Sequence, residues 1–168
     1  MIPTLHLDVC KRRGISPIGE PLVLIQPELF SETYTVTCMC SNSEIFISTR
    51  INSNTQLDFF NFIVDSINKS YLKYGDYLVI DNASIHGGLD TIEILIQFLE
   101  AEGINLIYLP TYSPELNPCE LIFAQVKRYL RENRDSTVSL LFDIGVGFAI
   151  PTVENLSNYY SKCCRTFQ

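Results

Sequence analysis

The chain has 168 residues, of which 46% are hydrophobic and 18% are charged, and its 12 Lys and Arg residues against 19 Asp and Glu residues leave a net charge of −7. This length fits one domain, and the composition excludes disordered, collagen-like and low-complexity proteins. The negative charge excludes a wholly basic nucleic-acid coat protein. It still permits a local basic face, because electrostatic attraction depends on where the charges lie.

The sequence predicts neither a membrane helix nor a secretory signal. Its longest apolar runs have four to five residues, as in Tyr77–Ile80, whereas a membrane helix needs about 20. Met1-Ile2-Pro3 leads directly into a strand-like stretch, without the charged and apolar regions of a signal peptide. Six Cys residues in such a chain predict reduced thiols. We therefore expect an intracellular protein that is not secreted and has no membrane partner.

Alternating apolar residues and turn residues predict strands in the first part of the chain, followed by a helix. Leu5 and Leu7 share one face of a strand that ends at Asp8, and Ser41-Asn42-Ser43 separates two β-rich runs in the manner of a hairpin turn. The predicted elements are a strand at Thr4–Asp8, a basic loop at Lys11–Pro21, strands at Thr33–Met39 and Glu44–Ser48, and a helix at about Thr55–Tyr71 with its apolar face at Phe60, Ile63, Val64 and Ile67.

Short apolar strands and helices alternate in the remainder of the chain. The continuous apolar run Tyr77–Ile80 is typical of a buried central strand. Further predicted elements are a helix at Leu89–Glu102, a strand at Ile104–Leu109, a helix from Pro118 to about Arg131, and weaker helical patterns near Thr137–Phe148 and Thr152–Cys163. The predicted fold class is α/β, a mixed sheet with helices on both faces. It forms a single domain over residues 1–168 with a helical tail at about 136–168.

Two acidic residues stand where an α/β sheet presents functional groups. Asp81 follows the strand Tyr77–Ile80, and open α/β sheets bind ligands beyond the carboxyl ends of their strands. Asp-Asn is also favoured in turns, where Asp81 would have only a local role. Glu120 follows Asn117 and Pro118 in a capping-box arrangement with Asn as the first residue. It can satisfy its own helix end or face Asp81, and local physics favours neither role.

Two segments of the sequence match a family pattern. Val79–His86 is a hydrophobic strand that runs into Asp-Asn-x-x-x-His, and Tyr108–Glu120 reads Tyr-Leu-Pro-Thr-Tyr-Ser-Pro-Glu-Leu-Asn-Pro-Cys-Glu. Lys127-Arg128 follows one helical stretch later. This arrangement resembles the catalytic domain of DDE-superfamily transposases of the mariner-like kind. The resemblance covers the chain from about Arg13 to Tyr160, and the second segment is the more specific of the two.

The resemblance implies an RNase H-like fold with two divalent metal ions, Mg²⁺ or Mn²⁺, held by three catalytic carboxylates. Asp81 matches the second acid and Glu120 the third, with 38 residues (82 to 119) between them. Carboxylate oxygens suit such hard cations. Two ions about 3.5–4 Å apart can activate the attacking oxygen and stabilise the leaving one in phosphodiester cleavage. Without metal, adjacent carboxylates are expected to raise each other's pKa.

The first acid of the family pattern has one nearby candidate, Asp8. Asp8 is followed by Val9, where the family commonly has Glu, and only five residues (9 to 13) separate it from Gly14. Two readings stay open. Asp8 is the first metal ligand, or the chain begins after the true first acid and is truncated at its N-terminus. In the second case metal binding would be weak and catalysis lost.

The resemblance assigns DNA contacts to a histidine and to basic residues. His86 occupies the family's His position, where it would orient Asp81 or contact DNA, and a loop histidine bonded to local backbone is the alternative. Arg12 and Arg13 precede the acids, and Lys127, Arg128 and Arg131 follow Glu120 on one helix. They are candidates for phosphate contacts. The residues on the helix also suit its C-terminal dipole.

The predicted function is a metal-dependent DNA endonuclease and strand-transfer domain of a mariner-like transposase. Its expected partners are transposon ends and target DNA, and a homodimer is compatible with this function. The alternative is a degenerate or domesticated module that binds nucleic acid or a protein without catalysis. Such transposases carry helix-turn-helix modules ahead of this domain, so we expect the DNA-reading region to be separate or missing. The expected location is nuclear in a eukaryote and cytoplasmic otherwise.

Overall fold

A hairpin forms the centre of the first sheet. The computed structural model describes residues 4–7, 34–81, 89–111, 113–133 and 139–165. Strand β2 (Tyr34–Cys40) pairs antiparallel with β3 (Ile45–Ile51) on one side and with β1 (Thr4–Leu7) on the other. The Ser41 hydroxyl accepts a hydrogen bond from the Glu44 N–H (3.0 Å), and the Ser41 N–H donates to the Glu44 carbonyl (2.8 Å). The predicted hairpin turn is therefore confirmed.

A β-α-β unit forms the second sheet. Strand β4 (Tyr77–Ile80) leads through α2 (Leu89–Ala101) to β5 (Asn105–Tyr108), which pairs with β4 in parallel. Gly103 follows the end of α2 and has a φ of +67°, a left-handed conformation that favours Gly after a helix. Leu78 and Ile80 are buried but Tyr77 is 67% exposed, so the continuous burial predicted for this strand is wrong at its first residue. In the described part of the chain, the strands form one antiparallel sheet of three and one parallel sheet of two.

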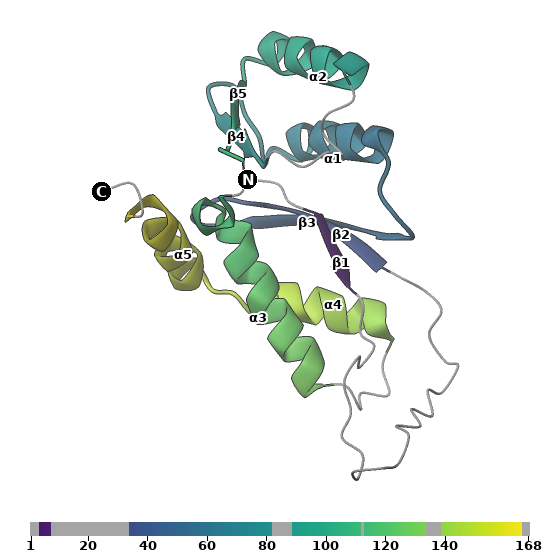
Figure 1. Ribbon diagram of the computed structural model, residues 1–168, viewed down its shortest axis with the longest axis vertical. Coiled ribbons are helices and arrows are strands. Elements are labelled where there is room, and N and C mark those ends of the chain that lie inside the picture. Colours follow the sequence, from purple (N-terminus) through teal and green to yellow (C-terminus); the bar gives the residue numbers. More distant parts are fainter. Residues whose placement is uncertain (1–3, 8–33, 82–88, 112, 134–138, 166–168) are drawn as a thin grey trace, which may run out of the picture.

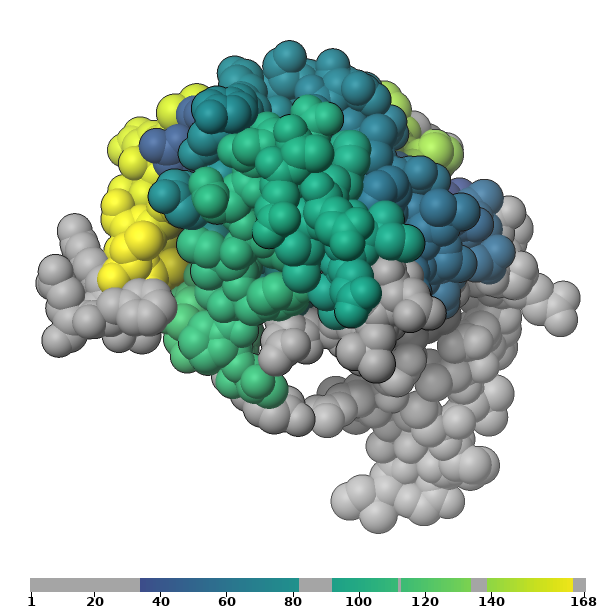
Figure 2. Space-filling model, turned by 90° about the horizontal axis from the view of Figure 1, so that it is seen from above, coloured from purple at the N-terminus to yellow at the C-terminus, as the bar shows by residue number. Residues whose placement is uncertain are grey.

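The helices cover both sides of β2 and β3, as predicted. Helix α1 (Gln56–Asn68) lies with α2 on one side (Figure 1). On the other side lie α3 (Pro118–Glu132), α4 (Leu140–Ala149) and α5 (Val153–Arg165), preceded by a 3₁₀ turn, η2 (Pro114–Leu116) (Figure 1). Seen from above, α1 and α2 form the top of the molecule, with α5 at one edge (Figure 2).

Strand β2 is buried on both faces because its alternate side chains enter two different cores. Val36, Cys38 and Cys40 face α3, α4 and α5, whereas Met39 faces α1, β4 and α2. The α3 side of the first core consists of Cys119, Ile122, Phe123, Val126 and Leu130. The second core is built around Phe59, Phe62, Ile63, Leu78, Ile80, Leu95 and Leu99. Leu95 and Leu99 are thus the buried residues that α2 contributes to the second core.

The buried face of α1 differs in part from the predicted one. Phe59, Phe62, Ile63 and Ser66 are buried, whereas the predicted Phe60 and Ile67 are only partly buried beside the core. Three Phe residues within four positions create two overlapping apolar stripes, and periodicity alone does not choose between them. The Ser66 hydroxyl donates to the Ile63 carbonyl (2.7 Å), which allows this polar side chain to lie in the core.

The two predicted helices of the tail are α4 and α5, and both belong to the first core through Ile144, Phe148 and Leu156. In the described ranges, no single helix is long and apolar enough to cross a membrane. The α4–α5 pair reaches that length and apolarity only together, across a 75° bend.

The close packing of α4 on α3 predicts opposite effects of two Gly→Ala substitutions. A Cβ added at Gly147 would lie 3.0 Å from Cγ1 of the buried Val126, whereas a Cβ at Gly145 would meet open space. Gly145→Ala should stabilise α4 by about 0.5–1 kcal/mol through helix propensity. Gly147→Ala should instead destabilise the protein by about 1 kcal/mol through overpacking. Urea unfolding followed by circular dichroism measures both, and equal stabilisation by the two variants would contradict the close α3–α4 contact.

Candidate functional site

Asp81 lies at the carboxyl end of β4, directly after the buried Ile80. The Ile80 carbonyl accepts a hydrogen bond from the Leu109 N–H (2.9 Å), which holds the end of β4 to the end of β5. The Asp81 side chain is half-buried, and its Oδ1 atom is shielded from solvent. The backbone that carries this carboxylate is therefore well fixed by the parallel sheet.

Glu120 lies in the first turn of α3, and this turn is deeply seated. Asn117 is 2% exposed and Cys119 is fully buried. The Asn117 side chain caps the helix by accepting from the Cys119 N–H (3.1 Å), and Pro118 is the first helical residue. The predicted N-cap and first residue are confirmed. The two bonds of a capping box do not form, because the Glu120 N–H donates to the backbone carbonyl of Asn117 (3.1 Å) and not to its side chain.

Helix α1 shows what a capping acid looks like in this protein. The Asp58 carboxylate accepts from the Thr55 N–H (2.8 Å), and the Thr55 hydroxyl accepts from the Asp58 N–H (3.2 Å). Arg50 forms an ion pair with Asp58. The hydrogen bonds from Thr55, more than the Arg50 charge, lower the pKa of Asp58. Glu120 stands at the corresponding position of α3, and its pKa shifts in the opposite direction.

The pKa of Glu120 is raised. Desolvation by the surrounding protein is the main cause, the positive charge of Lys127 opposes it, and the negative charge of Asp81 makes a smaller contribution that raises the pKa. The two carboxylates are thus close enough to repel each other, although they come from different elements. Such a pair of hard oxygen donors suits a divalent cation, whose charge would relieve the repulsion.

Asp8, the candidate for the first acid of the family pattern, lies outside the described residues, as do His86, Arg12 and Arg13. Their predicted roles stay predictions. Among the residues that the structure describes, no three Asp, Glu, His or Cys side chains come together to hold a metal ion. The described part of the site is therefore the Asp81–Glu120 pair.

The predicted basic residues of α3 are exposed, but they do not share one face. At about 100° per residue, Lys127 and Arg131 each lie within about 20° of Glu120 around the helix, whereas Arg128 lies about 80° away. Arg131 Nε donates to the Lys127 carbonyl (3.0 Å), which keeps its guanidinium along this face. Arg128 instead forms an ion pair with Glu132, with its Nε atom 3.9 Å from Glu132 Oε1. Lys127 and Arg131 therefore lie on the same face of α3 as Glu120.

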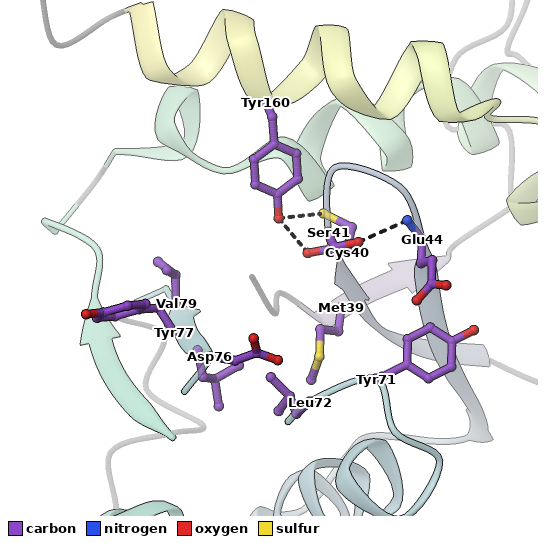
Figure 3. Close-up of a pocket in the computed structure, with 11 residues that line it drawn as sticks. Met39, Cys40, Ser41, Glu44, Tyr71, Leu72, Asp76, Tyr77, Val79 and Tyr160 are labelled. Atoms are coloured by element: carbon purple, nitrogen blue, oxygen red, sulfur yellow. Dashed lines mark hydrogen bonds between the residues drawn. The ribbon is translucent and has the colours of Figure 1, made fainter. Parts of the chain in front are cut away.

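A group of thiols and a phenol beneath Glu120 has no counterpart in the sequence predictions. Cys119 Sγ lies 3.2 Å from Cys40 Sγ, and the Tyr160 hydroxyl donates to the Cys40 carbonyl (2.5 Å). Figure 3 shows Tyr160 reaching from α5 to Cys40, above a cavity of about 230 Å³ that borders the start of β4. The sequence predicted only that the Cys residues are reduced thiols, and it gave no signal that Cys40, Cys119 and Tyr160 meet.

The thiols and the phenol of this group remain neutral at physiological pH. The hydrogen bond with Cys119, followed by burial, raises the pKa of Cys40, and burial raises the pKa of Cys119 and of Tyr160. The group therefore acts through neutral contacts and packing, and its thiols are unreactive by the usual dependence of reactivity on the thiolate.

The family of the chain follows from its sequence. The profile of the DDE superfamily endonuclease family matches residues 4–139, which is more than half of the chain. The chain therefore belongs to the DDE superfamily endonucleases, as the motif segments predicted. Enzymes of this superfamily use divalent metal ions. Among curated proteins, no significant sequence match is found.

Solved structures share the fold. The crystal structure of the Mos1 mariner paired-end complex with Mn matches with a TM-score of 0.70 at 18% identity, over 99% of this chain and 52% of that chain. The Mos1 strand transfer complex matches with a TM-score of 0.67 at 17% identity, over 93% of this chain and 47% of that chain. The Mos1 transposase paired-end complex with the left transposon end matches with a TM-score of 0.63 at 17% identity, over 98% of this chain and 54% of that chain. The predicted RNase H-like fold is confirmed, and the chain spans about half the length of these transposase chains.

The contrast between Asp58 and Glu120 predicts opposite pH effects on stability. A raised folded-state pKa means that ionisation of Glu120 opposes folding, so stability falls as pH rises from the unfolded pKa (4.5) through the folded one. Glu120→Gln should therefore melt at a higher temperature than the wild type at neutral pH without metal. A lowered pKa means that Asp58 stabilises the fold above its unfolded pKa (3.8) and stops doing so as pH falls through the folded value.

Asp58→Asn should therefore lower the free energy of unfolding by about 0.5 kcal/mol at neutral pH. The loss is small because solvent screens the Arg50–Asp58 ion pair. Thermal melts in a chelating buffer, at about pH 3 and about pH 7, measure both variants, and both differences should shrink at the lower pH. A lower melting temperature for metal-free Glu120→Gln at neutral pH would contradict the raised pKa of Glu120.

Proposed function

We propose that this chain is the catalytic domain of a mariner-like transposase and cleaves DNA phosphodiester bonds with the help of divalent metal ions. The observation that carries the proposal is the placement of Asp81 directly after β4 and of Glu120 in the first turn of α3, both within the part of the chain that matches the endonuclease family. Asp81 and Glu120 would be metal ligands, with Asp8 as the third. We propose Mg²⁺ or Mn²⁺, as a pair of ions.

The two described acids suit this task because they differ in surroundings. Asp81 is half-buried behind a hydrogen-bonded strand end, so it offers a fixed ligand position. Glu120 is exposed on a helix whose first turn is buried, so its carboxylate reaches the surface from a rigid base. Divalent ions bound there would supply the activation of the attacking oxygen and the stabilisation of the leaving oxygen. The protein's own contribution is to hold both ligands in place before the ions bind.

DNA is the proposed partner. One of the matching Mos1 structures is a complex with a transposon end, which supports transposon ends and target DNA as the partners of this chain. Lys127 and Arg131 lie on the Glu120 face of α3 and would contact phosphates beside the cleaved bond. We assign Arg12, Arg13 and His86 to the same DNA surface, and Arg128 to its edge, because Arg128 lies about 80° from Glu120 around α3. A separate DNA-reading region, a homodimer and a nuclear location in a eukaryote belong to this proposal.

Nicking of supercoiled DNA tests the proposed activity. With Mg²⁺ or Mn²⁺, the wild-type protein should convert supercoiled plasmid to the nicked form. Asp81→Asn and Glu120→Gln should each reduce the rate at least about 100-fold, since each loses metal stabilisation worth several kcal/mol in the transition state.

Two acids outside the site serve as matched controls. Asp76 precedes β4 just as Asp81 follows it, and Glu115 is an exposed acid in the turn before α3. Asp76→Asn and Glu115→Gln should nick at wild-type rates. A wild-type protein that binds DNA but leaves it intact with both metals would instead show a binding module without catalysis. Equal nicking by all five proteins would exclude Asp81 and Glu120 as ligands.

The positions around α3 predict an order among its basic residues. Lys127→Ala and Arg131→Ala should each weaken DNA binding and lower the slope of log K against log salt by about 1, as expected for the loss of one phosphate contact. Arg128→Ala should have a smaller effect, because Arg128 points away from the Glu120 face and lies beside Glu132. Fluorescence anisotropy with labelled duplex DNA at several salt concentrations measures this. A larger loss for Arg128→Ala than for the other two would contradict the proposed face.

A further inference from the structure

The far end of β2 presents backbone carbonyls that β3 does not use. In an antiparallel pair, hydrogen-bonded positions alternate. Because Ser41 bonds to Glu44, the carbonyls of Cys38 and Cys40 point away from β3. The described part of β1 pairs with β2 only as far as Thr37. Buried carbonyls need hydrogen-bond donors, and those at Cys38 and Cys40 find them on α3 and α5.

Side chains from two different helices cover these carbonyls. The Cys119 thiol on α3 donates to the Cys38 carbonyl (3.7 Å), and the Tyr160 hydroxyl on α5 donates to the Cys40 carbonyl (2.5 Å). The Cys40 side chain lies between the two helices, with its Sγ 3.2 Å from Cys119 Sγ and 3.9 Å from the Tyr160 oxygen (Figure 3). The first turn of α3 and the middle of α5 therefore rest on the same two residues of β2.

A second contact joins α5 directly to α3. The Tyr159 hydroxyl donates to Gln125 Oε1 (2.6 Å). Helix α5 thus contacts β2 through Tyr160 and α3 through Tyr159, while α3 contacts β2 through Cys119. These three contacts therefore link β2, α3 and α5 to one another. The α3 residue that contacts β2 is Cys119, directly before Glu120.

We propose that Tyr160 is a positioning residue for Glu120. Its bond to Cys40 fixes the end of β2 on which Cys119 rests, and the depth of Cys119 sets where the next side chain, Glu120, emerges beside Asp81. Metal ligands must be held within about 0.5 Å of their working geometry, so a shift of this turn would weaken metal binding without removing a ligand. This inference rests on the proposed function, because it assigns Glu120 as a ligand.

Two tyrosine variants separate positioning from general stability. Tyr160→Phe keeps the ring in the first core but removes the donor to the Cys40 carbonyl, and Tyr159→Phe removes the corresponding donor to Gln125, on the next turns of α3. Manganese binding, followed by electron paramagnetic resonance, should be about tenfold weaker in Tyr160→Phe, the lower end of what the loss of a supporting contact costs at a metal site. Tyr159→Phe should bind Mn²⁺ within about twofold of the wild type.

A split between the kinetic constants gives a second readout. In Tyr160→Phe, kcat for plasmid nicking at fixed Mn²⁺ should fall while KM for DNA stays unchanged, because the basic face of α3 is intact. Equal Mn²⁺ affinity in the wild type and Tyr160→Phe, or equal losses in both tyrosine variants, would overturn the positioning role. If the wild type itself binds no Mn²⁺, or binds it no better than Asp81→Asn, the proposed function fails first and the positioning role with it.

Discussion

The candidate site depends on a fold that fixes Asp81 at the end of β4 and Glu120 in the first turn of α3. A folded protein usually satisfies an acid near a helix start with local hydrogen bonds, as this one does for Asp58. Here Glu120 does not have that arrangement, and desolvation is the main cause of its raised pKa. A fold that holds a desolvated carboxylate ionised at neutral pH gives up stability. Gaining a cation at that point would restore it.

The packing explains how the fold keeps this pair in place. Asp81 is fixed by the parallel pairing of β4 and β5, and Glu120 by the buried cap of Asn117 and the fully buried Cys119. Neither support comes from the charged residues themselves. The site is therefore built on apolar packing and hydrogen bonds that form without an ion.

Local patterns predicted the elements well and the contacts between them poorly. The hairpin turn, the Asn117 cap and the two acids at a strand end and a helix start were all visible in short stretches of sequence, because each depends on neighbouring residues. The role of the cysteines was not. Cys40 and Cys119 are 79 positions apart, and nothing near either residue indicates that they meet. The neighbours of Glu120 in the sequence likewise left two roles open for it, because Asp81 lies far away in the sequence. The structure shows that the helix start is capped by Asn117 through the Cys119 N–H.

Strand β2 has a further consequence for how the protein unfolds. Its alternate side chains belong to two hydrophobic clusters, so the strand is part of both clusters and joins them. Opening either cluster exposes one face of the same strand and loosens the other. The two sheets should therefore melt together in one cooperative transition. Local opening is expected instead at the outer parts of the molecule that do not contact this strand.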